Sequence, residues 1–329
     1  MKKVFVGLSG GVDSTMATKI LIEKGYDVIG VFMRLSYNPF SKKSEENAKK
    51  IADFFKIPFL IFDFKEEFNK KIIGQFIDDF KRGVTPNPCI QCNKEIKFGL
   101  FFKEAKRRGA DFVATGHYIK KRGAFLYKAK DNNKDQSYFL WRLSKDQIKN
   151  SLFPLGDLRK EEVKKAIKKE KIITSEESQE ICFIEGDLYD FLKDKIEIKK
   201  GKILNENKDV LGEHDGVYFY TIGQRKGLDL GGGPFFVFKK DIKKNILYIT
   251  KNKNLLFKKE VNFKKANWFI ETDFPIKTTA KIRYRAKEEE CLIYKNKAIF
   301  KKNQSAATPG QSIVFYKNKK LIGGGIIYE

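Results

Sequence analysis

The sequence predicts an α/β protein whose N-terminal part is built on a parallel sheet and whose C-terminal part is rich in β-strands. Over roughly the first 186 residues, short apolar runs alternate with segments of helical periodicity. From residue 200 onward, short strand-like runs are separated by Gly, Asn, Lys or Asp turns. A chain of 329 residues is long enough for two or three domains. We therefore expect a parallel-sheet domain over 1–186, a small central β-rich domain over 187–242 and a C-terminal β-barrel over 243–329.

Strands and helices alternate strictly at the start of the chain. Residues 3–7 form a buried apolar run, and the sequence LSGGVDS leads from it into a helical pattern closed by Gly25. A strand is expected over 26–33, a helix near 44–56 and a third strand in PFLIFDF. This alternation predicts a parallel sheet.

Two further helices are expected in the N-terminal part. One is expected around 66–82, ending at Gly83, and the other is expected to begin at Asn93 as its N-cap, so that Cys89 and Cys92 would lie on a loop just before it. DFVATGHY predicts a further strand, and 159–171 predicts an exposed, charged helix. The C-terminal strands are expected in GVYFYTI, PFFVF, ILYIT, KTTAKIRYR, AIFK and SIVFY.

The charge balance favours a polyanionic partner. The chain has 67 Lys and Arg against 42 Asp and Glu, a net charge of +25. Nucleic acid is the first candidate, because cationic side chains release the counterions of phosphate. A Lys-rich composition that reflects the base content of a genome is the alternative.

Neither a long apolar segment nor a secretory signal is recognisable, so we expect a soluble, cytoplasmic protein that does not enter a membrane. Four cysteines in a chain of this length do not suggest a disulfide framework. They are expected to be reactive, metal-binding or incidental.

The glycine loop after the first strand has the composition of a phosphate site. Backbone N–H groups at the start of a helix attract an anion, and Gly10 and Gly11 let the backbone approach it closely. Ser9 and Ser14 can add hydroxyl donors, and Asp13 can hold Mg²⁺ or orient the pyrophosphate through it. The loop lacks the Gly-Lys-Ser/Thr ending of a Walker loop. An ordinary tight turn is the alternative, but the whole hexapeptide SGGVDS resembles the pyrophosphate loop of ATP pyrophosphatases, which implies adenylation of a carbonyl oxygen.

The pair Cys89 and Cys92 supports three interpretations: zinc, a redox pair, or half of an iron–sulfur site. A second CxxC is absent, which argues against structural zinc. A position at a helix start should lower the thiol pKa. Cys182 lies among apolar residues, where a buried, inert thiol is the default, and Cys291 has no partner motif and is interpreted as structural.

Eight segments in order resemble the bacterial tRNA-specific 2-thiouridylase family nearly from end to end. They are SGGVDS, TPNPCIQCNKEIKFG, ATGHY, KDQSYFL, SQEICFI, FYTIGQRKGL, KIRYR, and TPGQSIVFY with its GGGII ending. The resemblance implies a PP-loop ATP-pyrophosphatase domain, a small central domain and a C-terminal β-barrel that binds tRNA. It also implies an ATP-dependent sulfurtransferase that thiolates C2 of the wobble uridine of tRNA, with Lys, Glu and Gln acceptors.

The same resemblance implies a role for each matching residue. The ATP site would comprise Gly7, Leu8, Ser9, Gly10, Gly11, Val12, Asp13, Ser14, Met33 and Gly116. The target base would be faced by Asn87, Pro88 and Cys89. The tRNA would be contacted by His117, Lys134, Asp135, Gln136, Arg283, Tyr284 and Gln311. From the residues alone, His117 would be a capping or core histidine, Lys134 to Gln136 a solvated turn, and Arg283 and Arg285 exposed charges on a strand.

In the mechanism that the family implies, adenylation converts the C2 oxygen into a leaving group. A persulfide on Cys182 then delivers sulfur, and Cys92 is the partner nucleophile, leaving a Cys92–Cys182 disulfide to be reduced. A cysteine desulfurase, with or without relay proteins, is implied as the sulfur source.

Position 89 departs from the family pattern, because many relatives carry an aspartate there. A thiol can replace that acid–base group only if its pKa lies near the working pH. Three cysteines, Cys89, Cys92 and Cys182, could instead hold a [4Fe–4S] cluster that binds sulfide at its open iron. Two different functions also stay open: an amide-forming synthetase of the same superfamily, and an RNA-binding or sulfur-carrying paralogue that has lost catalysis.

Overall fold

The computed structural model describes residues 1–36, 38–175, 181–184, 186–271 and 273–329. The chain divides into two compact units. The first comprises Met1–Ile72, Pro88–Phe183 and Lys317–Ile322, and the second comprises Ile73–Asn87, Ile184–Tyr316 and Gly323–Glu329. The glycine loop and three of the four cysteines therefore belong to the first unit.

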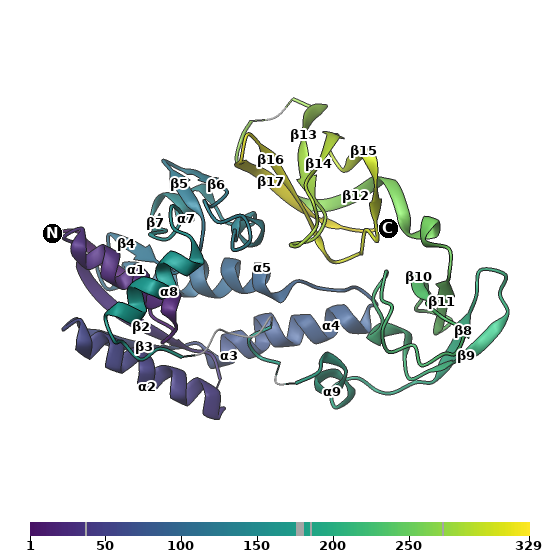
Figure 1. Ribbon diagram of the computed structural model, residues 1–329, viewed down its shortest axis with the longest axis horizontal. Helices are drawn as coiled ribbons and strands as arrows, with labels where there is room; N and C mark the ends of the chain where they lie inside the picture. Colours follow the sequence, from purple (N-terminus) through teal and green to yellow (C-terminus); the bar gives the residue numbers. More distant parts are fainter. Residues whose placement is uncertain (37, 176–180, 185, 272) are drawn as a thin grey trace. The chain divides into compact units, whose positions relative to one another are not determined.

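A five-stranded sheet with the order β3-β2-β1-β4-β7 forms the centre of the first unit (Figure 1). Every pairing in it is parallel, as the alternation of strands and helices predicts. The strands are β1 (Lys3–Gly7), β2 (Asp27–Arg34), β3 (Phe59–Asp63), β4 (Phe112–Ala114) and β7 (Ser151–Leu152). β4 is shorter than DFVATGHY predicts, since residues 115–119 follow it without strand structure.

Helices cover both faces of this sheet. Val4 and Val6 of β1 pack with Leu21 of α1 (Val12–Glu23) on one face. Phe5 points to the other face, toward Phe62, which in turn contacts the ring of Phe101 in α6 (Phe101–Arg107). The strands are thus buried on both sides, which explains their nearly continuous apolar sequences.

The helix α2 (Pro39–Phe54) packs on β2 and starts earlier than the apolar pattern predicts. Asn38 is its N-cap, accepting a hydrogen bond from the Ser41 N–H at 2.8 Å, and Pro39 occupies the first helical position. Both residue types favour a helix start, so the capping signal is a better guide here than apolar periodicity.

The helix that carries Cys89 and Cys92 begins at Pro88, so the prediction of a loop with Asn93 as N-cap was wrong. It runs through α5 (Pro88–Cys92), the π-helical η2 (Asn93–Leu100) and α6. Proline is favourable in a first helical turn because its missing N–H has no helical acceptor there. Asn93 is buried and donates from its amide to the Phe139 carbonyl instead.

Residues 65–81 form the helical run predicted around 66–82. It comprises α3 (Lys65–Phe68), the π-helical η1 (Asn69–Gly74) and α4 (Gln75–Lys81), and Gly83 follows with a positive φ of 73°. No helix within the described ranges is both long and apolar enough to cross a membrane.

The exposed, charged helix predicted for 159–171 is α8 (Lys160–Lys169), and it has one buried face. Val163 and Ile167 are buried on the face that packs against α1, and Lys160 is buried at its start. Spacings of three and four residues place all three on one side of the helix. The remaining elements of the first unit are β5 (Lys120–Arg122), β6 (Phe125–Tyr127), η3 (Ser137–Leu140) and α7 (Lys145–Lys149).

A four-stranded sheet with the order β10-β11-β8-β9 lies in the second unit. β10 and β11 pair antiparallel across residue 242, the boundary expected between the central and C-terminal domains. Val237, Leu247 and Ile203 form part of its apolar core. The elements are α9 (Leu188–Lys193), β8 (Gly201–Leu204), β9 (Val210–His214), η4 (Val217–Phe219), β10 (Phe236–Asp241) and β11 (Ile246–Thr250).

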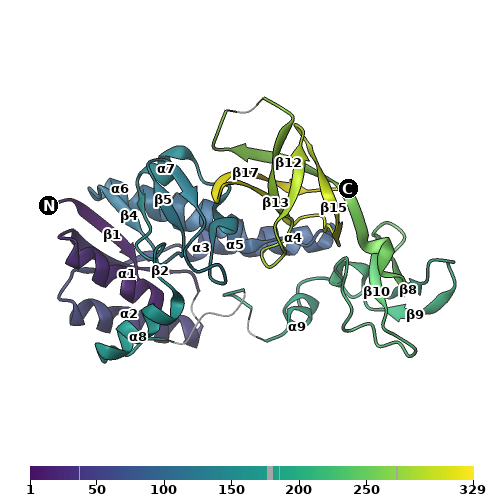
Figure 2. The ribbon, with the colours of Figure 1, turned by 45° about the horizontal axis from the view of Figure 1, so that its top comes forward.

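The C-terminal strands form a closed barrel (Figure 2). Their order is β12-β15-β14-β13-β16-β17, and β12 also pairs with β17, which removes the free edges. After η5 (Lys253–Leu256), the strands are β12 (Phe257–Trp268), β13 (Ile276–Lys281), β14 (Glu289–Ile293), β15 (Lys297–Ser305), β16 (Ser312–Lys317) and β17 (Lys320–Ile327).

One predicted strand of the C-terminal part was wrong, and one ends earlier than predicted. GVYFYTI contains the short 3₁₀ turn η4 rather than a strand, and the strand predicted in KTTAKIRYR ends at Lys281. Apolar and aromatic runs of this length can be buried in turns as well as in strands, so periodicity alone does not distinguish the two.

Ile167→Ala should lower the free energy of unfolding of the first unit by about 2–5 kcal/mol, because it leaves a cavity under α8. Lys165→Ala, on the exposed side of the same helix, should change it by less than about 0.5 kcal/mol. Urea denaturation followed by circular dichroism measures both. Equal effects would mean that α8 does not bury this face.

Candidate active site

The glycine loop is organised by its own hydroxyl groups. The Ser14 hydroxyl donates to the Gly11 carbonyl at 3.0 Å and accepts from the Ser9 N–H at 3.1 Å, and the Ser9 and Ser14 hydroxyl oxygens lie 3.1 Å apart. Gly10 has a positive φ of 81°, and a Cβ there would lie 2.6 Å from the Ser44 carbonyl oxygen. Only glycine fits this position without strain.

The loop ends at the start of α1, where the first N–H groups of any α-helix lack an acceptor within the helix. Gly11 is the N-cap and has no side chain to satisfy them. Together with the helix dipole, these groups favour a phosphate. The geometry therefore fits the nucleotide phosphates that the sequence predicts at this loop.

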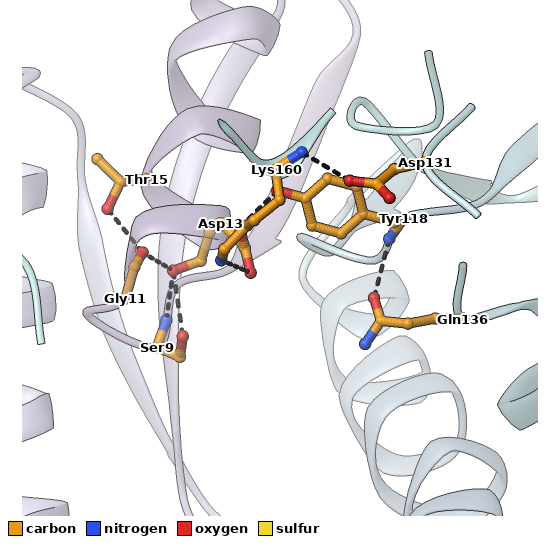
Figure 3. A network of polar contacts seen from close by, with 9 residues as sticks. Ser9, Gly11, Asp13, Thr15, Tyr118, Asp131, Gln136 and Lys160 are labelled. Atoms are coloured by element: carbon orange, nitrogen blue, oxygen red, sulfur yellow. Dashed lines mark hydrogen bonds and ion pairs between the residues drawn. The ribbon is translucent and has the colours of Figure 1, made fainter. Parts of the chain in front are cut away.

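Asp13 is held by two side chains from distant parts of the first unit (Figure 3). The Lys160 ammonium lies 2.7 Å from each carboxylate oxygen, and the Tyr118 hydroxyl donates to Oδ1 at 2.7 Å. The backbone N–H of Lys160 donates to Asp131 at 3.0 Å. The only acidic side chain of the loop thus carries an ion pair and a hydrogen bond.

Lys160 and Tyr118 are the functional candidates that the sequence analysis missed. A signal for Lys160 existed, because it is the first residue of α8, where the positive end of the helix dipole disfavours a lysine. A carboxylate near a lysine at that place offsets this unfavourable charge. Its identity, Asp13, lies 147 residues away and could not be read from the sequence.

The structure brings the other predicted nucleotide residues to the same edge of the sheet. A Cβ on Gly7 would lie 3.1 Å from the methyl carbon of Met33, and a Cβ on Gly116 would lie 2.8 Å from the backbone carbon of Asp13. These close approaches arise because the parallel strands β1, β2 and β4 all end at this edge.

Three cysteines gather in the first unit, and Cys291 lies in the barrel, buried on β14. Cys92 is buried, Cys89 is half-buried and Cys182 is exposed. The residue Cys182 is therefore more exposed than its apolar neighbours in the sequence suggest. The three thiols are close enough that the charge of Cys182 would raise the pKa of both Cys89 and Cys92.

Burial raises the pKa of Cys92 to about 12 and also raises the pKa of Cys89. The pKa of Cys182 is raised for the same reason, because protein atoms crowd its thiol although the residue as a whole is exposed. Lys97 acts in the opposite direction on all three thiols. The expected lowering of the pKa by the helix start was wrong, since the loss of hydration outweighs the helix dipole and Lys97.

No group of three or more His, Cys, Asp or Glu side chains within the described ranges is arranged to hold a metal ion. The three thiols therefore do not form a ready metal cage. The iron–sulfur site stays a prediction.

His117 and the following loop lie beside the nucleotide elements of the first unit. Only 7% of His117 is exposed, and its Nδ1 lies 2.8 Å from the Thr115 hydroxyl. Burial, followed by the charge of Lys97, holds the pKa of His117 well below its usual range. This histidine is neutral at pH 7, so it can offer a hydrogen bond but no positive charge.

Lys134 to Gln136 form an ordered loop rather than the solvated turn that these residues suggest. The buried Asp135 accepts hydrogen bonds from the Ala129 N–H and the Ser137 hydroxyl. Gln136 accepts from the Tyr118 N–H at 2.9 Å. The side chains of Asp135 and Gln136 are thus used to hold the loop, and Lys134 is half-buried.

The other predicted RNA and base contacts are distributed over both units. Arg283 is exposed and Tyr284 is half-buried, both in the turn after β13 rather than on a strand. Gln311 donates from its amide to the carbonyls of Thr85 and Pro86 at 3.0 and 3.2 Å, within the second unit. Asn87 ends that segment, next to Pro88.

The parallel sheet and its glycine loop define the class of protein as a PP-loop ATP-pyrophosphatase, here followed by two β-rich parts. Three family models match in order. They are described as tRNA methyl transferase HUP domain at 2–186, tRNA methyl transferase PRC-barrel domain at 189–251 and aminomethyltransferase beta-barrel domain at 258–327.

Full-length relatives specify the family. The tRNA-specific 2-thiouridylase MnmA of Syntrophomonas wolfei is 41% identical over 99% of this chain and 100% of its own length. The tRNA-specific 2-thiouridylase MnmA 1 of Clostridium tetani is 44% identical over 99% of this chain and 96% of its own length. The chain belongs to the tRNA-specific 2-thiouridylase family.

A solved structure with a similar fold is the U34-tRNA thiolase NcsA from Methanococcus maripaludis with its [4Fe-4S] cluster. It is 21% identical and has a TM-score of 0.38, over 53% of this chain and 58% of that chain. A likeness of this extent supports no conclusion about ligands of this chain.

Iodoacetamide should alkylate Cys182 first in the folded protein, because it is the one exposed cysteine among the three of the site. Its rate should rise roughly tenfold per pH unit below its raised pKa, since the thiolate is the reactive form. Cys92, with a pKa of about 12, is about one part in ten thousand thiolate at pH 8 and should react slowly. Peptide mapping by mass spectrometry measures each site, and urea-unfolded protein is the control in which all four react. Labelling of Cys92 as fast as Cys182 in the folded chain would contradict the burial of Cys92.

Proposed function

We propose that this chain replaces the C2 oxygen of the wobble uridine of tRNA by sulfur, using ATP to activate that oxygen. The observation that carries the proposal is that one compact unit holds both a phosphate loop at a helix start and three neighbouring cysteine thiols. The names of the full-length relatives support this reaction. Two of the family models are named for methyl transfer, but a phosphate loop beside thiols suits adenylation and sulfur transfer better.

Adenylation is the first step. The uracil C2 oxygen attacks the α-phosphorus of ATP, forming an O–P bond and releasing pyrophosphate. Residues Gly7 to Ser14 hold the phosphates, while Met33 and Gly116 line the nucleotide site. Mg²⁺, when bound with ATP, would neutralise phosphate charge, with Asp13 holding it or orienting the pyrophosphate through it.

Sulfur transfer is the second step. The terminal sulfur of a Cys182 persulfide attacks C2, and AMP leaves with the former C2 oxygen. The Cys92 thiol gives up its proton and attacks the Cys182 sulfur, which breaks the S–S bond and leaves the terminal sulfur on the base. The resulting Cys92–Cys182 disulfide needs two electrons from a thiol reductant before the next cycle. The exposure of Cys182 supports its role as the carrier, because a donor protein must reach it.

Many relatives carry an aspartate at position 89 as an acid–base group. In this scheme Cys89 would not take over that role. Burial raises the pKa of its thiol, so at neutral pH it neither holds negative charge nor accepts a proton readily. With Asn87 and Pro88, we assign it to the surroundings of the target base.

Contacts to tRNA would come from both units. In the first unit we assign them to His117 and the loop of Lys134, Asp135 and Gln136, where Lys134 supplies the positive charge. In the second unit we assign them to Arg283, Tyr284 and Gln311. The net charge of +25 supports a polyanionic partner. We expect tRNAs for Lys, Glu and Gln as substrates, a cysteine desulfurase or relay protein as the sulfur source, and a cytoplasmic location.

Cys182→Ala should abolish thiolation of unmodified tRNA while leaving tRNA-dependent release of pyrophosphate within about threefold of wild type, because adenylation precedes sulfur transfer. Asp13→Ala should abolish both, and Cys291→Ser, in the barrel, should change neither. Thiolated nucleoside is measured by mass spectrometry, and pyrophosphate by a coupled assay. If the Cys182→Ala enzyme thiolates at the normal rate, the assignment of this cysteine is wrong.

Iron analysis distinguishes the persulfide route from the [4Fe–4S] route. Protein purified without oxygen should contain little iron and should thiolate tRNA with a desulfurase and cysteine. About four irons per chain, lost together with activity in Cys89→Ala, would instead establish the cluster. A protein that binds tRNA but neither adenylates nor thiolates it would support the interpretation as an RNA-binding or sulfur-carrying paralogue.

A further inference from the structure

The buried lysine beside the phosphate loop has a role that the sulfur chemistry does not require. Only 8% of the Lys160 side chain is exposed, and its ammonium lies 2.7 Å from both oxygens of Asp13. A buried charge is costly unless it is paired, and α8 disfavours a positive charge at its first residue. The position of Lys160 therefore depends on the carboxylate of the loop.

Asp13 by itself would oppose the ligand that the loop is built to bind. It stands in the first turn of α1, where the N–H groups and the helix dipole attract phosphate. Its negative charge would repel a triphosphate at the same place, because like charges at close range in a partly buried site interact strongly. A positively charged side chain held next to the Asp13 carboxylate, as Lys160 is, removes this conflict.

We propose that Lys160 is a positioning residue that serves as the counter-ion of the phosphate loop, cancelling the charge of Asp13 so that the loop accepts the triphosphate end of ATP. It acts through Asp13 and not by gripping the phosphates itself. Tyr118 helps to keep the carboxylate turned toward Lys160, since its hydroxyl donates to the same oxygen, Oδ1, that Lys160 contacts (Figure 3). This inference rests on the proposed function, because that function requires ATP at the loop.

The lysine is itself fixed from two sides. Its backbone N–H donates to Asp131 at 3.0 Å, and its ammonium lies 5.9 Å from the centre of the Tyr118 ring. Val163 and Ile167 anchor the same helix face against α1, whose first turn contains Asp13. The ion pair therefore joins two elements that are packed together, so the charge on Asp13 is compensated before any nucleotide arrives.

Equilibrium dialysis with radiolabelled ATP and AMP, in EDTA at low ionic strength, tests the proposal on the full chain. Lys160→Met should weaken ATP binding by about 10- to 100-fold, the range of coupled neighbouring charges. AMP binding should change by less than about threefold, because AMP lacks the phosphates that the loop would hold. The double variant Asp13→Asn/Lys160→Met removes both charges and should bind ATP at least about threefold more tightly than Lys160→Met.

Two further variants guard against a merely structural effect. Lys130→Met removes a lysine from an exposed ion pair with Glu162 in the same region and should leave ATP binding within about twofold. Lys160→Arg keeps the charge and should retain most of the affinity for ATP. If Lys160→Met is poorly folded by circular dichroism, the double variant, which leaves neither charge unpaired, is compared with wild type instead. A loss of ATP affinity of more than about 100-fold in the double variant, the full effect expected of an uncompensated Asp13, would then overturn the inference.

The outcomes separate this inference from the proposed function. If the double variant binds ATP no better than Lys160→Met, or if ATP and AMP are weakened equally, Lys160 does not act through the charge of Asp13. Wild-type protein that binds ATP only with Mg²⁺ would also overturn the inference, because a neutralised loop needs no metal to accept phosphate. Wild-type protein that binds no ATP under either condition would overturn the proposed function itself.

Discussion

The parallel pairing of β1 with β2 on one side and β4 on the other is the constraint on which the candidate site depends. All three strands run in the same direction, so their carboxyl ends meet at one edge of the sheet. The glycine loop follows β1, Met33 lies near the end of β2, and Gly116 follows β4. A site for a nucleotide at this edge follows from the topology, as in other open α/β sheets.

Electrostatics then decides how the groups of this edge can act. Loss of hydration keeps the thiols of Cys89, Cys92 and Cys182 protonated, with Lys97 as an opposing positive charge. At the loop, by contrast, an acidic and a basic side chain, Asp13 and Lys160, form an ion pair. Neutral thiols are protected from stray oxidation and alkylation, and they become nucleophiles only when a neighbour takes the proton. The same unit thus combines a phosphate loop whose aspartate is paired with a lysine and a group of neutral thiols.

Much of the fold of the first unit was predictable because local signals agreed with tertiary structure. Apolar runs identified β1, β2 and β3, and Gly25 and Gly83 marked helix ends. The errors arose where a local signal was overlooked or outweighed. Pro88 begins a helix that the pattern placed after Cys92, and KIRYR leaves its strand early although its residues suit one. The assignment of site residues came from the motifs, which identify candidates but not their hydrogen bonds.

The sequence by itself determined the order of strands and helices at the start of the chain, the glycine loop and the family to which the chain belongs, because each is carried by short segments of contiguous residues. Only the tertiary structure decided that Lys160 pairs with Asp13, that Asp135 and Gln136 hold their own loop, and that burial reverses the expected shift of the thiol pKa values. Each of these depends on how much water is excluded and on which distant side chains meet, and neither quantity is a property of a local segment of chain.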